Sequence, residues 1–185
     1  MSKGEINGVD TDHLLFARGV VGDTPAAGDY TWRASNQWTH GTHSKTTIGG
    51  YFGLGEERNH KGTYEFEADH PLEFNAEDNA ATPVEIVLAG LASCLTAGVA
   101  AVAENREIKL RSVKATLEAD MNIGGILGSD PDVRNGFSDV RVNYEIDADD
   151  TSEADVEALV AQSQKISAVF DILTNPTNVT VGINS

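Results

Sequence analysis

The chain of 185 residues is poor in several residue types, and each shortage excludes a class of protein. It has one cysteine, so neither an intramolecular disulfide nor a cysteine-rich zinc or iron–sulfur site is available. It has 13 Lys and Arg against 29 Asp and Glu, a net charge of −16, which disfavours nucleic acid and anionic membrane surfaces as partners. The remaining composition, 40% hydrophobic and 23% charged, is typical of a globular domain.

Long apolar stretches are also scarce. The first ten residues contain no apolar run that would serve as a secretory signal, so we expect a cytoplasmic protein. One segment, 86–103, runs eighteen residues without a charge, at the lower limit for a membrane span. It is mostly Ala, Gly, Ser, Thr and Val, however, with few large residues that drive insertion. We interpret it as a helix buried on all faces inside a protein core, and expect no membrane partner.

The N-terminal part predicts a short extension followed by three strands. Residues 1–29 are expected to be an extension in which Asp10 or Thr11 caps a short helix, and 30–185 a single domain. Alternation of apolar and polar residues predicts strands over 30–35, 46–52 and 64–68, with Gly49-Gly50 interrupting the second. We expect these to form a meander with turns at 37–45 and 53–62.

The remainder of the chain predicts one long helix, two strands and a helical end. Thr82-Pro83-Val84-Glu85 is a capping box with proline at the first helical position, so the helix should run to about Glu104. Strands are expected over 113–121 and 140–146. The C-terminal part predicts a helix capped by Thr151 or Ser152, a break near Ser167, a second helical turn and a closing strand over 178–183. This order of elements indicates an α+β fold.

Cys94 is the first residue that invites a chemical interpretation. It lies in the middle of the long helix, and a lone cysteine in an Ala-rich helix is most often a small buried hydrophobic residue. A reactive thiol would need some exposure and a positive neighbour, which the helix does not supply. The candidates for such a neighbour lie elsewhere: Arg33, His40, His43, Arg58 and His60.

Glu85 precedes Cys94 by nine residues, which on a helix is the opposite face and about 13 Å along the axis. We therefore interpret Glu85 first as the acid of the capping box, and as a second possibility as a residue that positions an arginine. The histidines His40, His43 and His60 could join Cys94 in a mixed N and S metal site. Their spacing lies in a predicted turn and lacks an evident fourth ligand, so we expect no metal and no cofactor.

The order of several segments resembles the OsmC/Ohr family. The helix ATPVEIVLAGLASCLTAGVA (81–100) is similar to the family's central helix with its cysteine, and QSQKISAVFDILTNPTNVTV (162–181) to its last helix. Segments 37–57, 68–74 and 110–133 resemble the hairpin, connection and strand–loop of one OsmC-like subgroup. The resemblance covers about residues 30–183. It implies an α+β fold and a homodimer whose two chains interleave their sheets around the central helices.

The resemblance also implies a chemistry, from which this chain departs. In the family, the cysteine matching Cys94 attacks organic or hydrogen peroxides as a thiolate, helped by an arginine and a glutamate. A second cysteine then resolves the sulfenic acid. Here the second cysteine is replaced by Ser167, so an external thiol must reduce the oxidised Cys94. The helix start also shifts the acid, because Val84 stands where peroxidase members carry it, one residue before Glu85.

Three functional hypotheses follow. The first is a one-cysteine thiol peroxidase with Cys94 as nucleophile, Arg58 or Arg33 as its cationic neighbour and Glu85 orienting the arginine. Its substrate pocket would be lined by His40, His43 and Ser167. The second is a non-catalytic dimer that holds a small apolar ligand, with Cys94 as packing. The third is a small metalloprotein.

Overall fold

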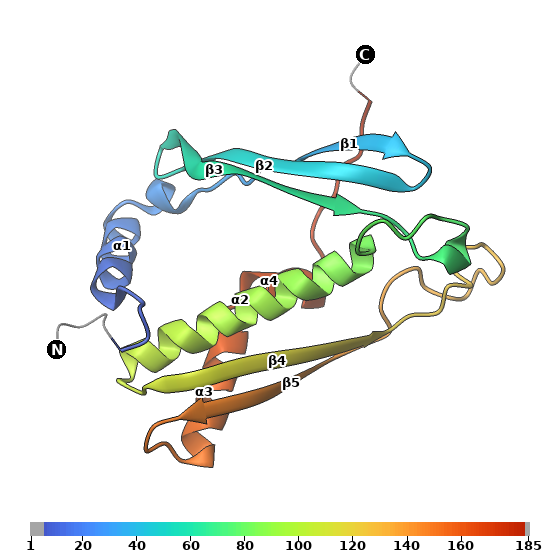
Figure 1. Cartoon of the computed structure of the whole chain (residues 1–185). Helices are drawn as coiled ribbons and strands as arrows, with labels where there is room; N and C mark the ends of the chain where they lie inside the picture. Colours follow the sequence, from blue (N-terminus) through green and yellow to red (C-terminus); the bar gives the residue numbers. More distant parts are fainter. Residues whose placement is uncertain (1–5, 184–185) are drawn as a thin grey trace. The chain divides into compact units, whose positions relative to one another are not determined.

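The computed structural model describes residues 6–183, and Figure 1 shows its helices and strands. The chain divides into two compact units. The N-terminal unit comprises Asp10–Val87, and the C-terminal unit comprises Met1–Val9 with Leu88–Ser185. Helix α2 (Pro83–Asn105) begins in the first unit and continues into the second. Among the described residues, each unit has its own antiparallel sheet, with three strands in the first and two in the second.

The N-terminal unit contains the predicted meander, in which β2 pairs with both β1 and β3. The predicted interruption at Gly49-Gly50 is wrong, because β2 continues through both glycines; they coincide only with a shift of the β2–β3 register between Ile48 and Gly50. The elements of this unit are α1 (Thr11–Asp23), η1 (Pro25–Gly28), β1 (Ser35–His40), β2 (His43–Gly53), β3 (Glu56–Ala68) and η2 (Leu72–Phe74).

The boundaries in this unit differ from prediction. Residues 30–34 make only an isolated bridge between Thr31 and Phe52, and β1 lies in the segment predicted to be a turn. The two predicted long turns are instead two-residue turns at Gly41-Thr42 and Leu54-Gly55. Positive φ angles at Gly41 and Gly55 permit these tight reversals. Only two residues therefore separate β1 from β2, and two separate β2 from β3. The expected cap is confirmed: Asp10 accepts a hydrogen bond from the His13 N–H, and α1 continues to Asp23.

Asp69 holds the β1–β2 turn against the connection that follows β3. Its side chain is 1% exposed. One carboxylate oxygen accepts from the Thr42 hydroxyl at 2.6 Å and from the His70 N–H at 2.8 Å. The other accepts from the N–H and the side-chain amide of Asn79, both at 3.1 Å. These donors hold the pKa of Asp69 well below its usual range, the Thr42 hydroxyl contributing most.

The C-terminal unit packs α2 against a helix pair and a two-stranded sheet. A buried cluster of Val102 and Ala103 from α2 with Leu159 from α3 forms its core, and Ile108 and Leu110 pack against it. The predicted strands and helices are confirmed as β4 (Leu110–Asp120), β5 (Asp139–Ala148), α3 (Glu153–Ile166) and α4 (Ala168–Thr174). Ser152 caps α3 by accepting from the Asp155 N–H.

Two expectations about this unit are wrong for the single chain. The predicted closing strand over 178–183 is irregular and exposed, with Val179 at 80% and Val181 at 91%. A strand needs the edge of a neighbour, and within the described residues none pairs with this segment. Helix α2 is also not buried on all faces: Leu91, Leu95 and Val99 form a buried stripe, whereas Val87 is 40% exposed.

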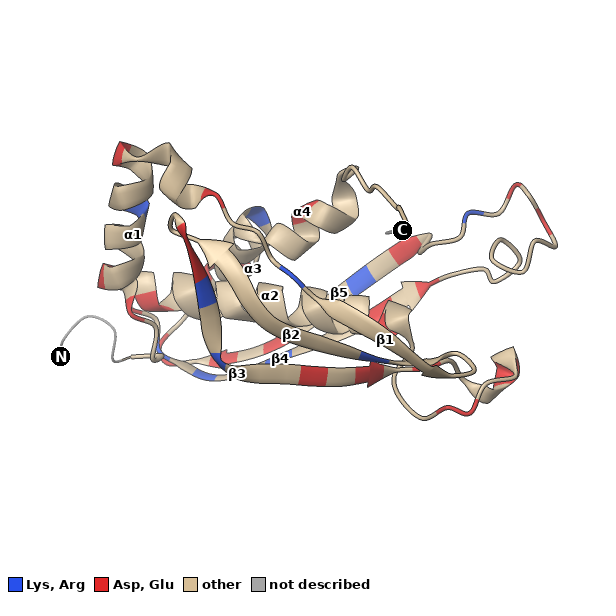
Figure 2. Cartoon of the chain, turned by 90° about the horizontal axis from the view of Figure 1, so that it is seen from above, with Lys and Arg blue, Asp and Glu red and all other residues tan. Residues whose placement is uncertain are grey.

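Acidic residues are spread over the chain, and α2 is strongly apolar. Figure 2 shows Asp and Glu distributed along both units rather than gathered on one element. Helix α2 is long and apolar enough to cross a membrane by length and composition alone, with a mean hydropathy of 2.2. Its end carries Glu104, which is buried and accepts hydrogen bonds from the backbone N–H groups of Ile6 and Asn7. These contacts join the C-terminal end of α2 to the segment that precedes α1.

Candidate functional site

Cys94 and Ser167 lie together in the C-terminal unit, although 73 residues separate them. Cys94 is partly buried on α2, and Ser167 is 5% exposed between α3 and α4. The Ser167 hydroxyl donates a hydrogen bond to Cys94 Sγ at 3.1 Å. The structure thus places a hydroxyl group at the only thiol of the chain.

The surroundings of Cys94 act on its pKa in opposite directions. Burial alone raises the pKa of the thiol, because it disfavours the charged thiolate. The Ser167 hydroxyl and the backbone N–H groups of Val169 and Ala168 lower the pKa, and together they outweigh burial. The net effect is a Cys94 pKa below its ordinary value, which increases the thiolate fraction at neutral pH.

Local structure explains why Ser167 faces α2. Ser167 ends α3 and begins α4, where its hydroxyl oxygen accepts from the Phe170 N–H at 3.2 Å. Serine is favoured at such a position because its side chain satisfies a free backbone N–H. One turn earlier, the Ser163 hydroxyl donates to the Leu95 carbonyl of α2 at 2.5 Å. A side chain on Gly98 would collide with Ser163, so glycine permits this close approach of α2 and α3.

The predicted cationic neighbours lie in the N-terminal unit, and each has a local partner there. Arg33 makes two hydrogen bonds to the Glu57 carboxylate, at 2.6 and 2.9 Å. Arg58 bonds to Glu56 at 2.7 Å and to the Gly53 carbonyl at 3.1 Å. The role of these arginines toward Cys94 stays a prediction.

The remaining predicted site residues of this unit are also locally engaged. His43 Nε2 lies 3.1 Å from Glu67, and His40 Nε2 lies 3.9 Å from Glu77. The Glu85 carboxylate accepts from the Thr82 N–H at 2.9 Å, which is the capping contact expected from the sequence. Within residues 6–183, no group of three His, Cys, Asp or Glu side chains is arranged to hold a metal ion. The metalloprotein hypothesis therefore gains no support.

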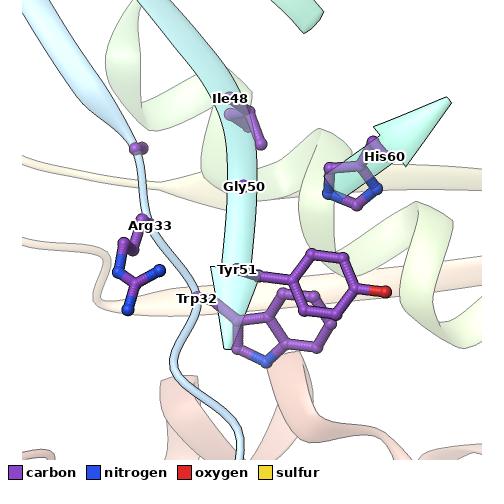
Figure 3. Close-up of a pocket in the computed structure, with 7 residues that line it drawn as sticks. Trp32, Arg33, Ile48, Gly50, Tyr51 and His60 are labelled. Carbon is purple, nitrogen blue, oxygen red and sulfur yellow. The ribbon is translucent and has the colours of Figure 1, made fainter. Parts of the chain in front are cut away.

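The N-terminal unit also carries a row of aromatic rings that the sequence pattern did not predict. Trp32 stacks on Tyr51 with ring centroids 5.0 Å apart, and Tyr51 lies 5.1 Å from His60. Trp32, Tyr51 and His60 line a pocket of about 300 Å³ together with Arg33 and Ile48. Figure 3 shows the three rings on one side of β2 and Arg33 on the other. The alternation of Tyr30 and Trp32 signalled one apolar face, but the pairing of β2 with β3 was needed to bring His60 to it.

Comparison with known proteins identifies the family. The family model of OsmC-like proteins matches residues 76–182, which is more than half of the chain. The chain belongs to the OsmC-like family. No curated protein matched the sequence.

Solved structures support the same fold at low sequence identity. An OsmC-like protein from Mycoplasma pneumoniae has a TM-score of 0.59 and 13% identity, over 77% of this chain and 86% of that one. An organic hydroperoxide resistance protein OsmC from Legionella pneumophila has a TM-score of 0.54 and 19% identity, over 77% and 90%. An OsmC-like protein of unknown function from Vibrio cholerae has a TM-score of 0.58 and 10% identity, over 76% and 91%. The α+β arrangement of an N-terminal meander, a long central helix, antiparallel strands and C-terminal helices is therefore that of an OsmC-like protein.

Proposed function

We propose that this OsmC-like protein is a one-cysteine thiol peroxidase that reduces organic hydroperoxides or hydrogen peroxide in oxidative stress defence. The observation that carries the proposal is the environment of Cys94. Three hydrogen-bond donors, from Ser167, Ala168 and Val169, lower the pKa of a thiol that is only partly buried. A thiolate, rather than a thiol, is the nucleophile in such reactions.

The reaction has two parts. The Cys94 thiolate attacks one oxygen of ROOH, the O–O bond breaks, and the leaving RO⁻ takes up a proton to give ROH and the sulfenic acid of Cys94. The chain has one cysteine, so an internal disulfide cannot follow. A small external thiol condenses with the sulfenic acid, releasing water and leaving a mixed disulfide. A second molecule of the external thiol then attacks this mixed disulfide, which releases the Cys94 thiolate and forms a disulfide between the two external thiols.

Auxiliary residues are proposed from the N-terminal unit. Arg33 or Arg58 would supply a positive charge near the reacting atoms, Glu85 would orient that arginine, and His40 and His43 would line the substrate pocket. The support is the family to which the chain belongs and the residue types themselves. Replacing each arginine in turn by Met should identify the one that acts, as a loss of peroxide turnover with unchanged folding.

A homodimer is part of the proposal. In the C-terminal segment, Val179, Val181 and Ile183 alternate with a threonine and a glycine, and all three apolar side chains are at least 80% exposed. An alternating segment of this kind is suited to pair with a sheet edge and bury one face. We propose that a second copy of the chain provides this edge, and that the dimer works in the cytoplasm. Sedimentation velocity of the full chain and of one ending at Asn178 tests the contact: the full chain should be dimeric and the shorter chain monomeric.

The decisive experiment measures Cys94 directly. The rate of alkylation by iodoacetamide as a function of pH gives the thiolate pKa, with Cys94→Ser as the control for other sites. Peroxide consumption is then followed with cumene hydroperoxide or hydrogen peroxide and excess dithiothreitol. We expect fast alkylation at neutral pH and catalytic turnover that is lost in Cys94→Ser. A slow thiol with no turnover above the Cys94→Ser control would reject the peroxidase.

One observation favours a second candidate, a non-catalytic dimer that binds a small apolar ligand. Among residues 6–183, every group that lowers the Cys94 pKa is neutral, whereas activated thiolates commonly have a cation beside them. In this case Cys94 would contribute packing, and the purified protein would retain a small apolar molecule. Mass spectrometry of the denatured protein extract separates the two candidates, because a peroxidase does not need a resident ligand.

A further inference from the structure

We propose that Ser167 is a positioning residue for the Cys94 thiolate: it occupies the place of a resolving cysteine but acts by holding the sulfur in one orientation for attack on the peroxide. This inference rests on the proposed function. It concerns how the thiolate is held, however, and its central measurement does not depend on turnover.

The hydrogen bonds of Ser167 leave its hydroxyl little freedom. A serine hydroxyl has one proton to donate and two lone pairs to accept with. The Phe170 N–H occupies one acceptor site at 3.2 Å, and the proton points to Cys94 Sγ at 3.1 Å. Because the residue is 5% exposed, water has little access to compete for the proton. A thiolate is a stronger acceptor than a thiol, so this hydroxyl favours the reactive form.

The position of Ser167 is itself held firmly by the contact between α2 and α3. Ser163 and Gly98 each lie one turn from the reacting pair, Ser163 before Ser167 and Gly98 after Cys94. Ser163 is 1% exposed and bonds to α2, and Gly98 leaves no space between the helices for a side chain. The distance between the Ser167 hydroxyl and the sulfur is therefore set by packed helices rather than by a mobile loop.

Three variants of Ser167 test its hydroxyl. Ser167→Gly and Ser167→Ala both remove the hydroxyl and its bond to the Phe170 N–H. Glycine weakens a helix start less than alanine does, so an effect of equal size in both variants comes from the lost hydroxyl at the sulfur, and Ser167→Thr retains a hydroxyl. We expect the alkylation rate at pH 7 to fall about fivefold to tenfold in both Gly and Ala variants, as expected for losing one charge-assisted hydrogen bond. The pH midpoint should move upward in both, and Ser167→Thr should restore the wild-type values.

Two matched controls guard against general effects. Ser93→Ala deletes a hydroxyl one residue from Cys94 that donates to the Ala89 carbonyl at 2.8 Å instead of to the thiol. Ser152→Gly deletes the equivalent serine cap of α3. Both should keep the wild-type alkylation profile. Equal profiles for wild type, Ser167→Gly and Ser167→Ala would overturn the inference, as would an upward shift of the same size in Ser93→Ala.

A fourth variant tests the place of Ser167 in the reaction. Ser167→Cys puts a second sulfur where the hydroxyl lies, and one equivalent of peroxide should then oxidise Cys94 to the sulfenic acid. The new thiol attacks it, water leaves, and an intramolecular disulfide forms, seen as the loss of two hydrogen atoms in the intact mass. Persistent sulfenic acid without a disulfide would show that residue 167 does not lie in line with the sulfur.

The outcomes distinguish this inference from the proposed function. A shift of the alkylation profile in Ser167→Gly together with absent turnover in the wild type would retain the positioning role and reject the peroxidase. Normal turnover together with unchanged profiles in all the Ser167 variants would retain the peroxidase and reject the positioning role.

Discussion

The contact between Gly98 and Ser163 predicts that Gly98→Ala destabilises the protein, against the rule that alanine improves a helix. A Cβ atom at residue 98 would lie 2.4 Å from Ser163 Oγ and 3.1 Å from its Cβ. The nearest backbone atom, Ser163 Cα, would be 3.3 Å away. The serine cannot avoid the methyl group by rotating its hydroxyl alone, since its own Cβ is also too close.

The magnitude follows from three effects. Overpacking a buried contact costs about 1–3 kcal/mol. Displacing the Ser163 hydroxyl breaks its bond to the Leu95 carbonyl and leaves a buried polar group, which costs about 1–3 kcal/mol. The better helix propensity of alanine returns about 1 kcal/mol. We therefore expect a loss of roughly 3 kcal/mol in the free energy of unfolding.

Urea denaturation followed by circular dichroism measures this loss, and a second substitution checks its cause. Ser163→Gly removes the Oγ and Cβ atoms, which are the two that the new methyl group approaches most closely, so Gly98→Ala should cost much less in that background. Because residues 98 and 163 are one turn from Cys94 and Ser167, Gly98→Ala alone should also slow Cys94 alkylation. A Gly98→Ala protein as stable as wild type, or more stable, would refute the reasoning and show that the two helices separate without cost.

Three further predictions concern buried groups. Leu159→Ala should lower the free energy of unfolding by about 2–5 kcal/mol in urea, because Leu159 is fully buried in the core cluster; a smaller loss would mean that the site collapses around the cavity. The lowered pKa of Asp69 contributes stability that is present above the pKa of an unfolded aspartate, about 3.9, and is lost as pH falls through the folded value. Asp69→Asn should therefore flatten the acid limb of thermal stability, and an acid limb as steep as that of the wild type would contradict this reasoning. Glu104→Ala should release the contact with Ile6 and Asn7 and speed amide exchange at both; unchanged exchange would contradict the contact.

Local signals in the sequence predicted the helices well. The capping box at Thr82 and the charged stretch after Glu104 predicted both ends of α2, because caps act within a few residues of the chain. The break near Ser167 was likewise visible, since a serine that leaves one helix and caps the next is a local feature. The strand boundaries were harder to predict. The tight turn at Gly41 sets the register in which β1 pairs with β2, so β1 does not coincide with the segment of strongest alternation.

Contacts between segments distant in the sequence could not be predicted from such local signals. The residues 178–183 have the alternation of a strand, but alternation does not show which edge would receive them, and within the described chain they remain unpaired. Helix α2 was expected to be buried all round because its composition is apolar, whereas its exposure depends on which elements cover each face.

The sequence by itself determined that the chain is an acidic α+β protein with one thiol on a long apolar helix, because composition and local periodicity need no partner. Its order of motifs also pointed to the OsmC-like family, and that resemblance predicted that Ser167 stands where the family carries a second cysteine. Only the tertiary structure decided that this serine donates a hydrogen bond to Cys94 Sγ at 3.1 Å. The physical reason is that a thiol pKa depends on burial and on donors brought in by packing, here from residues more than seventy positions away.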